Sequence, residues 1–294
     1  MIRPLLVAAT ALALVAGPAA AQKKAKAPAA APAAPAKPGE PTAADWRTPN
    51  PEDVLVIDTN KGRIYVEMLP EIAPAHVVRV RELARAGFYD GRSFFRVIDQ
   101  FMAQTGDPQD TGEGGSDKPD LAQEFLFRLG ADTGFVQVAD QTVSQTGFIK
   151  SLPVMSQSAM LMAMTADGKI SAWPLYCPGV AAMARANEPD SANSQFFLMR
   201  QAYPSLEKRY TAWGRVISGL DVVRAIKTGE PVVAPQDKMD KVRILADMAA
   251  GERPKVVRVI DPKSPWFKAE VESVRAEKGA DFTPCAIRVP SEIK

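Results

Sequence analysis

The stretch "SFFRVIDQFMAQTGD", Ser93 to Asp107, places one arginine, Arg96, among apolar side chains. Its first part, "SFFRVI", predicts a β-strand, because aromatic and β-branched residues favour extended backbone. A guanidinium is always charged and weakly hydrated, so it can lie beside apolar surface where its donors meet acceptors. Arg96 is therefore either a solvated strand residue or a residue that receives a ligand.

The segments before this stretch predict a hairpin and a helix. "VLVIDT" (54–59) and "RIYVEML" (63–69) alternate in polarity, and the Asn60-Lys61-Gly62 sequence between them is typical of a hairpin turn. In "APAHVVRVRELARAGFYDG" (73–91), Pro74 suits a first helical turn and Gly87 a helix end. We expect a helix from about Ala73 to Ala86.

The later segments continue this pattern of strands with a second helix. "SGLDVVRAIKTG" (218–229) predicts a short helix that begins near Ser218 or Asp221. The predicted strands are "GVAAMARA" (179–186), "SQFFLMR" (194–200), "TAWGRVI" (211–217) and "VRILAD" (242–247).

Two segments differ from the rest. Residues 128–177 are less regular and carry Met155, Met160, Met162 and Met164, which form either an adaptable binding surface or, more often, core filling. In the tail, Ser264-Pro265 predicts the start of a helix that runs to about Lys278, with Gly279 as its stop. We expect this helix to pack on the domain.

The first residues are typical of a signal peptide for export. A cationic Arg3 precedes an apolar run from Leu5 to Ala16, and we expect cleavage after Ala21. No second apolar run long enough to span a bilayer follows, so no membrane segment is expected after cleavage. The alanine-rich signal suits a Gram-negative bacterium and places the protein in the periplasm. Residues 22–50, rich in Ala, Pro and Lys, predict a disordered linker.

The net charge bears on nucleic-acid binding, and the two cysteines bear on a disulfide. Lys and Arg total 36 against 34 Asp and Glu, so a net charge of +2 gives no general attraction to nucleic acid. The two cysteines, Cys177 and Cys285, belong to a chain expected in an oxidising compartment. They form either a disulfide or two separate buried thiols.

The sequence lacks the residues that several kinds of catalytic or ligand site require. His76 is the single histidine, and no G-x-S-x-G elbow or partnered cysteine accompanies it, so nucleophilic hydrolysis is not expected. Two distant cysteines and one histidine match no metal-ligand spacing. The glycine-rich "DTGEGGSD" (110–117) lacks the lysine and spacing of a phosphate-binding P-loop.

Five motifs follow one another along the chain: "APAHVVRVRELARAGFYDG" (73–91), "FFRVIDQFMAQTGD" (94–107), "DTGEGG" (110–115), "MARANEPDSANSQFFL" (183–198) and "TAWGRVISGLDVVRAI" (211–226). By these motifs and their order, the sequence from about Val54 to Asp247 resembles the cyclophilin family of peptidyl-prolyl isomerases. The resemblance implies a mainly β fold, a closed eight-stranded antiparallel barrel capped by two helices. It assigns residues 51–247 to a cyclophilin-like domain, with residues 128–177 as an insertion and residues 248–294 as a C-terminal helical extension.

The resemblance also implies a site on the outer face of the barrel. Arg96 and Gln104 fall on catalytic positions: Arg96 would donate to the prolyl nitrogen of a twisted amide, and Gln104 would hold a substrate carbonyl and orient the guanidinium. The substrate-binding positions are the proline-pocket residues Phe101, Met102, Phe197 and Leu206, and the groove residues Ala184, Arg185, Ala186 and Tyr210.

The implied function is isomerisation of X-Pro bonds in unfolded or partly folded exported proteins. The implied substrate is a proline-containing polypeptide; no cofactor and no nucleic acid are expected, and the chain is expected to act as a monomer. The alternatives are a catalytically weak peptide-binding or chaperone module, whose groove the insertion occludes, and a scaffold held by its linker. Because Cys177 ends the insertion and Cys285 lies in the tail, we expect these two additions to pack together.

Overall fold

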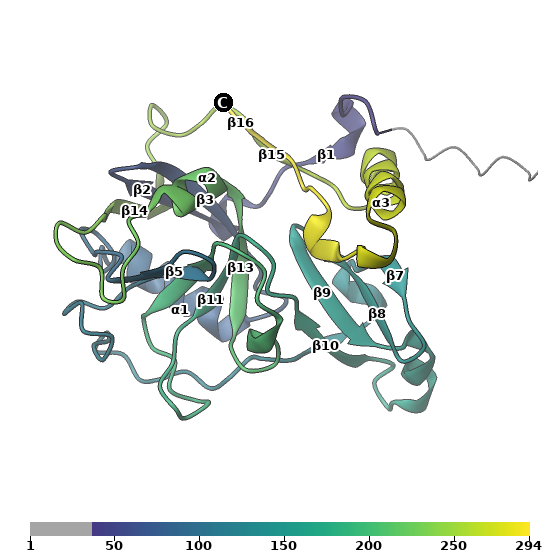
Figure 1. Ribbon diagram of the computed structural model, residues 1–294, viewed down its shortest axis with the longest axis horizontal. Helices are drawn as coiled ribbons and strands as arrows, with labels where there is room; N and C mark the ends of the chain where they lie inside the picture. The colour runs from purple at the N-terminus through teal and green to yellow at the C-terminus, as the bar shows by residue number, and fades with distance from the viewer. Residues whose placement is uncertain (1–36) are drawn as a thin grey trace, which may run out of the picture. The chain divides into compact units, whose positions relative to one another are not determined.

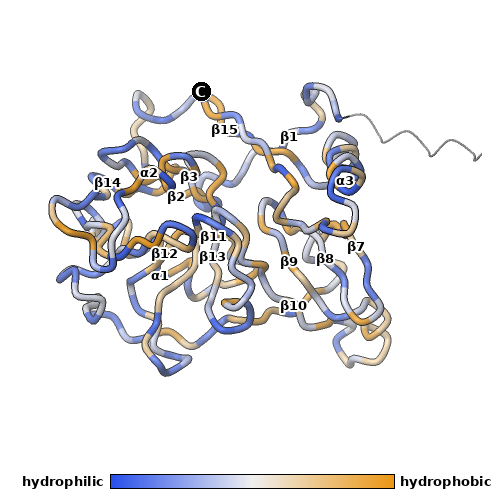
Figure 2. The backbone as a smooth tube through the Cα atoms, in the orientation of Figure 1, coloured by the Kyte–Doolittle hydropathy of each residue, from blue (hydrophilic) through white to orange (hydrophobic). Residues whose placement is uncertain are grey.

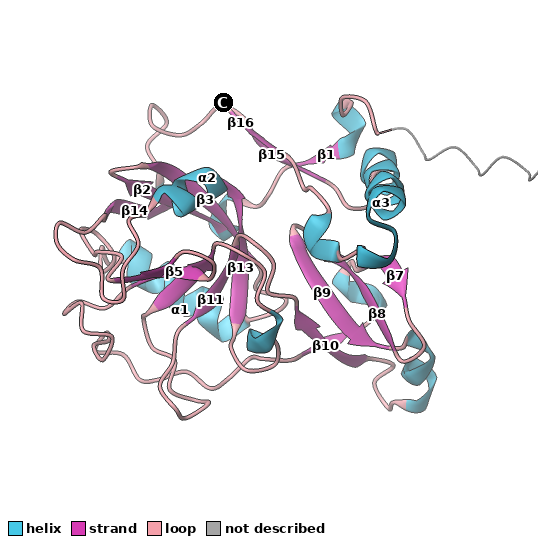
Figure 3. Ribbon diagram, in the orientation of Figure 1, coloured by secondary structure: helices cyan, strands magenta, loops and turns pink. Residues whose placement is uncertain are grey.

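The computed structural model describes residues 37–294, which contain three β-sheets and three α-helices (Figure 1; Figure 3). The predicted signal peptide, residues 1–21, and the first part of the predicted linker lie outside the described residues. Within residues 37–294, no helix has the length and apolar character needed to cross a membrane.

An eight-stranded antiparallel sheet confirms the predicted mainly β class. Its strands are hydrogen-bonded in the order β14-β2-β3-β13-β11-β12-β5-β4. The strands are β2 (Val54–Thr59), β3 (Gly62–Met68), β4 (Arg96–Ile98), β5 (Met102–Thr105), β11 (Val180–Met183), β12 (Phe196–Met199), β13 (Ala212–Ser218) and β14 (Met239–Ile244).

The barrel is less closed than expected. The sheet curls, but its edge strands β4 and β14 form no continuous ladder with each other. Isolated bridges, Val97 with Gly229 and Ser93 with Lys238, instead connect β4 and the residues before it to the segment that leads into β14. The segment before β14 contains Pro231 and Pro235, which have no amide hydrogen to donate, and this prevents a regular strand there.

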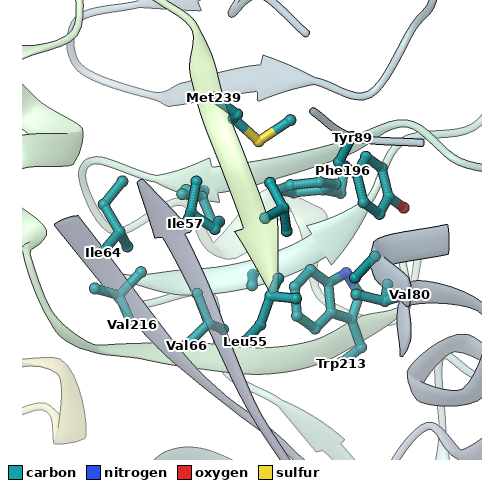
Figure 4. Packing of buried hydrophobic residues seen from close by; sticks show 14 of the residues in the cluster. Leu55, Ile57, Ile64, Val66, Val80, Tyr89, Phe196, Trp213, Val216 and Met239 are labelled. Carbon is teal, nitrogen blue, oxygen red and sulfur yellow. The ribbon is translucent and has the colours of Figure 1, made fainter. Parts of the chain in front are cut away.

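Apolar side chains on the inner face of the sheet form its core (Figure 4). Leu55 and Ile57 of β2 lie inside with Ile64 and Val66 of β3, as the two-residue period of a strand requires. Tyr89, Phe196 and Trp213 meet edge to face in this core, with ring centroids 5.3 and 5.6 Å apart. Figure 2 shows hydrophobic residues along the strands and hydrophilic residues in many of the connecting loops.

Two helices accompany this sheet, as expected. Helix α1 (Pro74–Arg85) places Val77 and Val80 in the core, and its first free amides, those of Ala75 and His76, donate to the carboxylate of Glu124. Helix α2 (Leu220–Ala225) begins after Gly219, so neither of the two predicted side chains caps it.

Residues 128–177, expected to be irregular, supply most of a second antiparallel sheet. Its order is β6-β10-β9-β8-β7. Core filling is wrong for Met160 and Met164, whose exposed fractions are 76% and 82%, although Met155 and Met162 pack against buried residues. The strands are β6 (Phe127–Leu129), β7 (Val136–Asp140), β8 (Ser144–Ile149), β9 (Leu152–Gln157) and β10 (Ile170–Pro174).

The tail forms a helix and a third sheet. Helix α3 (Pro265–Lys278) begins and ends where predicted: the Ser264 hydroxyl accepts from the Phe267 amide, and Gly279 follows its last residue. Strands β15 (Val257–Ile260) and β16 (Ser291–Ile293) pair with β1 (Trp46–Arg47).

The presence of β1 corrects the predicted extent of the linker. The Asp45 carboxylate accepts from the Trp266 amide at the start of α3, and Arg47 pairs with the buried Glu67 of β3. The segment is therefore ordered from about Ala43, because Glu67 of β3 and Trp266, 221 positions from Asp45, bind it.

Short 3-10 turns complete the described elements: η1 (Ala43–Asp45), η2 (Pro51–Asp53), η3 (Ala131–Thr133), η4 (Ala159–Met164), η5 (Pro204–Leu206), η6 (Leu245–Asp247), η7 (Gly279–Asp281) and η8 (Pro284–Ala286).

The insertion and the tail contact each other directly. Phe148 of β8 and Phe267 of α3 meet edge to face with centroids 5.2 Å apart, where α3 lies beside β7 and β8 in Figure 1. Cys177 and Cys285 form a disulfide between the end of the insertion and the tail.

Candidate active site

A cavity of about 720 Å³ opens on the outer face of the curled sheet. Strands β4, β5 and β12, the residues that follow β11, and turn η5 contribute to its lining. It brings together nine of the ten predicted site residues, all except Ala186: Arg96, Phe101, Met102, Gln104, Ala184, Arg185, Phe197, Leu206 and Tyr210.

The floor of the cavity is apolar because strands alternate their side chains between two faces. On β12, Phe196 points into the core, so the next residue, Phe197, points outward into the cavity. Met102 and Phe197 are 1% and 4% exposed, and Leu206 of η5 is 8% exposed. Phe101 lies at the rim and packs on Tyr203, with centroids 4.4 Å apart. This arrangement offers a shallow apolar pocket to a small ring.

Polar side chains form a chain of hydrogen bonds along one side of this floor. Arg96 and Gln104 are directly opposite in the β4–β5 pair, and Arg96 Nη1 donates to Gln104 Oε1 at 3.2 Å. Gln104 Nε2 donates to Gln195 Oε1 at 2.8 Å, and Gln195 Nε2 donates to the Gly112 and Gly114 carbonyls. Gln195 was not among the predicted site residues, although it belongs to the "SQFF" motif.

Asp107 holds the glycine-rich loop against the cavity. Its carboxylate accepts from the amides of Gln109, Thr111, Gly112 and Gly114 at 2.6 to 3.2 Å. Burial opposes the charge, but these hydrogen bonds prevail and lower the pKa of Asp107 below its ordinary value. Thr111 and Gly112 thereby become part of the cavity lining.

The opposite side of the cavity is shaped by Arg185 and Tyr210. The Arg185 guanidinium lies over the Tyr210 ring, 4.6 Å from its centroid, and donates to the Arg209 and Ala186 carbonyls. Ala186 itself lines a neighbouring cavity of about 480 Å³, together with Gln195.

Glu230 and Pro231 also line the cavity, although no motif in the sequence indicated them as site residues. They lie in the segment between α2 and β14, and the Glu230 carboxylate pairs with Arg96 at 2.6 Å. The two partners are 134 positions apart in the chain, which explains why no local pattern indicates their contact.

Comparison with known proteins agrees with this geometry. The family model for "Cyclophilin type peptidyl-prolyl cis-trans isomerase/CLD" matches residues 54–246. The chain belongs to the cyclophilin family.

Its relatives carry the same enzymatic name. A "Probable peptidyl-prolyl cis-trans isomerase" of Brucella suis biovar 1 (strain 1330) is 32% identical over 213 residues, which cover 67% of this chain and 85% of the relative. "Peptidyl-prolyl cis-trans isomerase-like 1" of Mus musculus is 30% identical over 207 residues, 70% of this chain and 95% of the relative. This cyclophilin is thus a peptidyl-prolyl cis-trans isomerase.

One solved structure shares the fold over a larger part of this chain than the family model matches. The crystal structure of cyclophilin AquaCyp293 from Hirschia baltica is 34% identical, with a TM-score of 0.77 over 84% of this chain and 93% of that chain. The similarity therefore extends beyond residues 54–246.

Residues 128–177 of this cyclophilin pack against the buried side of the pocket residues and not in the cavity itself. Within the described chain, no residue of 128–177 lines the cavity of Arg96. Met102, Phe197 and Leu206 instead share one buried apolar cluster with residues of β9 and β10. Tyr176 connects the two regions: its ring lies 6.4 Å from that of Phe197, and its hydroxyl donates to the Tyr210 carbonyl at 2.8 Å. Burial raises the pKa of the Tyr176 phenol.

Proposed function

We propose that this isomerase acts on X-Pro bonds of unfolded or partly folded exported proteins, with Arg96 and Gln104 as its catalytic residues. The observation that carries the proposal is an open cavity whose apolar floor lies beside an arginine held by a glutamine. A proline ring fits an apolar floor, and the amide beside it then faces the guanidinium.

The physical task is to lower the barrier to amide rotation. Resonance makes this barrier about 18–20 kcal/mol, so uncatalysed isomerisation takes tens to hundreds of seconds. As the amide twists, the prolyl nitrogen loses conjugation and gains a lone pair that accepts a hydrogen bond. A donor at Arg96 stabilises the twisted amide more than either planar form, and only such a difference raises the rate.

The apolar residues have a complementary role. Phe101, Met102, Phe197 and Leu206 hold the pyrrolidine ring, so that one side of the amide stays fixed while the other rotates. They also exclude water, which strengthens the hydrogen bond from Arg96. Gln104 keeps the guanidinium oriented and can receive a substrate carbonyl through its free amide hydrogen.

The groove residues would bind the chain on either side of the proline. Ala184 and Tyr210 leave an apolar surface, and Arg185 is held beside it by the Tyr210 ring and the Arg209 carbonyl. Ala186 would contact residues further from the proline, because it lies in the neighbouring cavity.

We also propose that the protein works in the periplasm as a monomer. The signal-like sequence of residues 1–21 supports export, and the disulfide of Cys177 and Cys285 suits a compartment that permits oxidation. One chain supplies the whole cavity, which supports the monomer. Cell fractionation and N-terminal sequencing test the proposal: it expects a periplasmic form that begins at Gln22, and a cytoplasmic form that begins at Met1 would refute it.

A second candidate function is a peptide-binding or chaperone module with weak turnover. The exposed apolar side chains of Met160 and Met164 favour it, because methionine adapts to varied apolar partners.

A protease-coupled assay on a short Ala-Pro peptide distinguishes the two functions. Arg96→Ala removes a charge-assisted hydrogen bond of about 1.5–3 kcal/mol, so kcat/KM should fall about 10-fold to 100-fold. Arg128→Ala, which removes an exposed arginine of β6 paired with Asp167, is the matched control and should keep full activity. Equal activity of wild type and Arg96→Ala would contradict the catalytic role and favour the binding module.

A further inference from the structure

The Arg96 guanidinium contacts Glu230 on one edge and Gln104 on another. Arg96 Nε donates to Glu230 Oε1 at 2.6 Å, and Nη2 lies 2.6 Å from the same oxygen. Nη1 donates to Gln104 Oε1 at 3.2 Å. A guanidinium has five N–H groups, so these three contacts leave two N–H groups for a substrate.

The backbone around Glu230 is fixed to the strand that carries Arg96. Gly229 and Val97 exchange two hydrogen bonds of 2.8 Å each, and the Val232 amide donates to the Phe95 carbonyl at 2.8 Å. Phe95 and Val97 are the two chain neighbours of Arg96. Glu230 is thus held opposite Arg96 by hydrogen bonds on both sides.

The segment that carries Glu230 is also anchored at its two ends. Val232 is 3% exposed and belongs to the barrel core. The Asp237 carboxylate accepts from the Lys227 amide at 2.7 Å and from the Asn60 side chain at 2.6 Å. A Cβ atom at Gly229 would lie 2.6 Å from the Val232 backbone, so the close approach of this segment depends on glycine.

We propose that Glu230 is a positioning residue for catalysis, which holds the Nε edge of Arg96 so that the two remaining N–H groups face the substrate amide. The proposal rests on the proposed role of Arg96. Both side chains are partly exposed, 36% for Arg96 and 55% for Glu230, and such a pair contributes little to stability. Its main effect is to restrict a long side chain to one orientation, and catalysis is sensitive to such placement.

The test is the Glu230→Gln variant, with kcat and KM measured separately on the Ala-Pro peptide. Glutamine keeps the size of the side chain and removes its charge. We expect kcat to fall about 5-fold to 10-fold with KM changed less than about twofold, because a misplaced guanidinium weakens the twisted state more than substrate binding. The difference between wild type and variant should shrink near 1 M salt, where the Debye length is about 3 Å. Glu252→Gln is the matched control, since Glu252 also pairs with an arginine, Arg243, and is 57% exposed.

A double variant separates positioning from a general effect on the segment. In an Arg96→Ala background, Glu230→Gln should change kcat no further, because its target is gone. An equal loss in both backgrounds, an unchanged kcat in the single variant, or a faster single variant would each overturn the proposal. Failure of the underlying function is visible separately, since wild type and Arg96→Ala would then have the same activity.

Discussion

Replacing Asp107 with asparagine should lower both stability and activity, because the Asp107 carboxylate organises the glycine-rich loop beside the cavity. Oδ2 accepts from the Thr111, Gly112 and Gly114 amides, and Oδ1 accepts from the Gln109 amide. In Asp107→Asn, one of the two acceptors becomes an NH₂ group. With the amide oxygen in the place of Oδ2, the Gln109 amide faces another donor.

The expected loss follows from these contacts. A hydrogen bond to a charged acceptor contributes about 1.5–3 kcal/mol, against about 0.5–1.5 kcal/mol for a neutral one. Losing one bond and weakening the others should lower the free energy of unfolding by about 3 kcal/mol. Activity should fall as well, since the Gly112 and Gly114 carbonyls hold Gln195, which in turn holds Gln104.

Urea unfolding at several pH values checks this prediction. The folded protein lowers the pKa of Asp107 below its ordinary value of 3.8, so its stabilisation is complete above about that pH. It is lost as the pH falls through the lower, folded value, and the difference between wild type and Asp107→Asn should shrink there. Asp117→Asn, an exposed position in the same segment, should stay within about 0.5 kcal/mol of wild type. Equal stability of wild type and Asp107→Asn near neutral pH would refute the reasoning.

Two further predictions concern the contact between the insertion and the tail. The disulfide joins residues 108 positions apart, so replacing Cys177 and Cys285 with serine should lower the free energy of unfolding by about 4–5 kcal/mol. Dithiothreitol should lower the urea midpoint of wild type and leave the variant unchanged; a midpoint common to all samples would contradict this. Phe267→Ala removes a side chain that is 1% exposed and packs on Phe148, which should lower stability by about 3–5 kcal/mol. Limited proteolysis should then cleave the tail faster than in wild type, and an unchanged cleavage rate would count against the contact.

Local signals predicted the elements whose causes are local. The Ser264 hydroxyl caps the helix three residues further on, and Gly279 follows its last residue, so α3 is recognisable from its own sequence. The hairpin of β2 and β3 is similar, because Gly62 at its turn has a φ of 136°, which favours glycine. The positions of Phe196 in the core and Phe197 in the cavity fit the two-residue period of a strand, although the family resemblance, and not this period, assigned Phe197 to the site.

Distant contacts decided what the sequence left open or predicted wrongly. The pattern of a segment does not say which of its faces another segment will cover, so Met160 and Met164 resembled core residues but are exposed. In the same way, β1 is ordered only because the tail and Glu67 bind it.

By itself, the sequence determined the cyclophilin family and nine residues of the cavity, since motifs preserve order along the chain. Only the tertiary structure brought Glu230 to Arg96 and Tyr176 to Phe197. Each of these contacts joins chain segments through backbone bonds or packing that no single segment specifies. Arg96, the proposed catalytic arginine, is therefore readable from its motif, whereas the groups that hold its guanidinium in place depend on the fold.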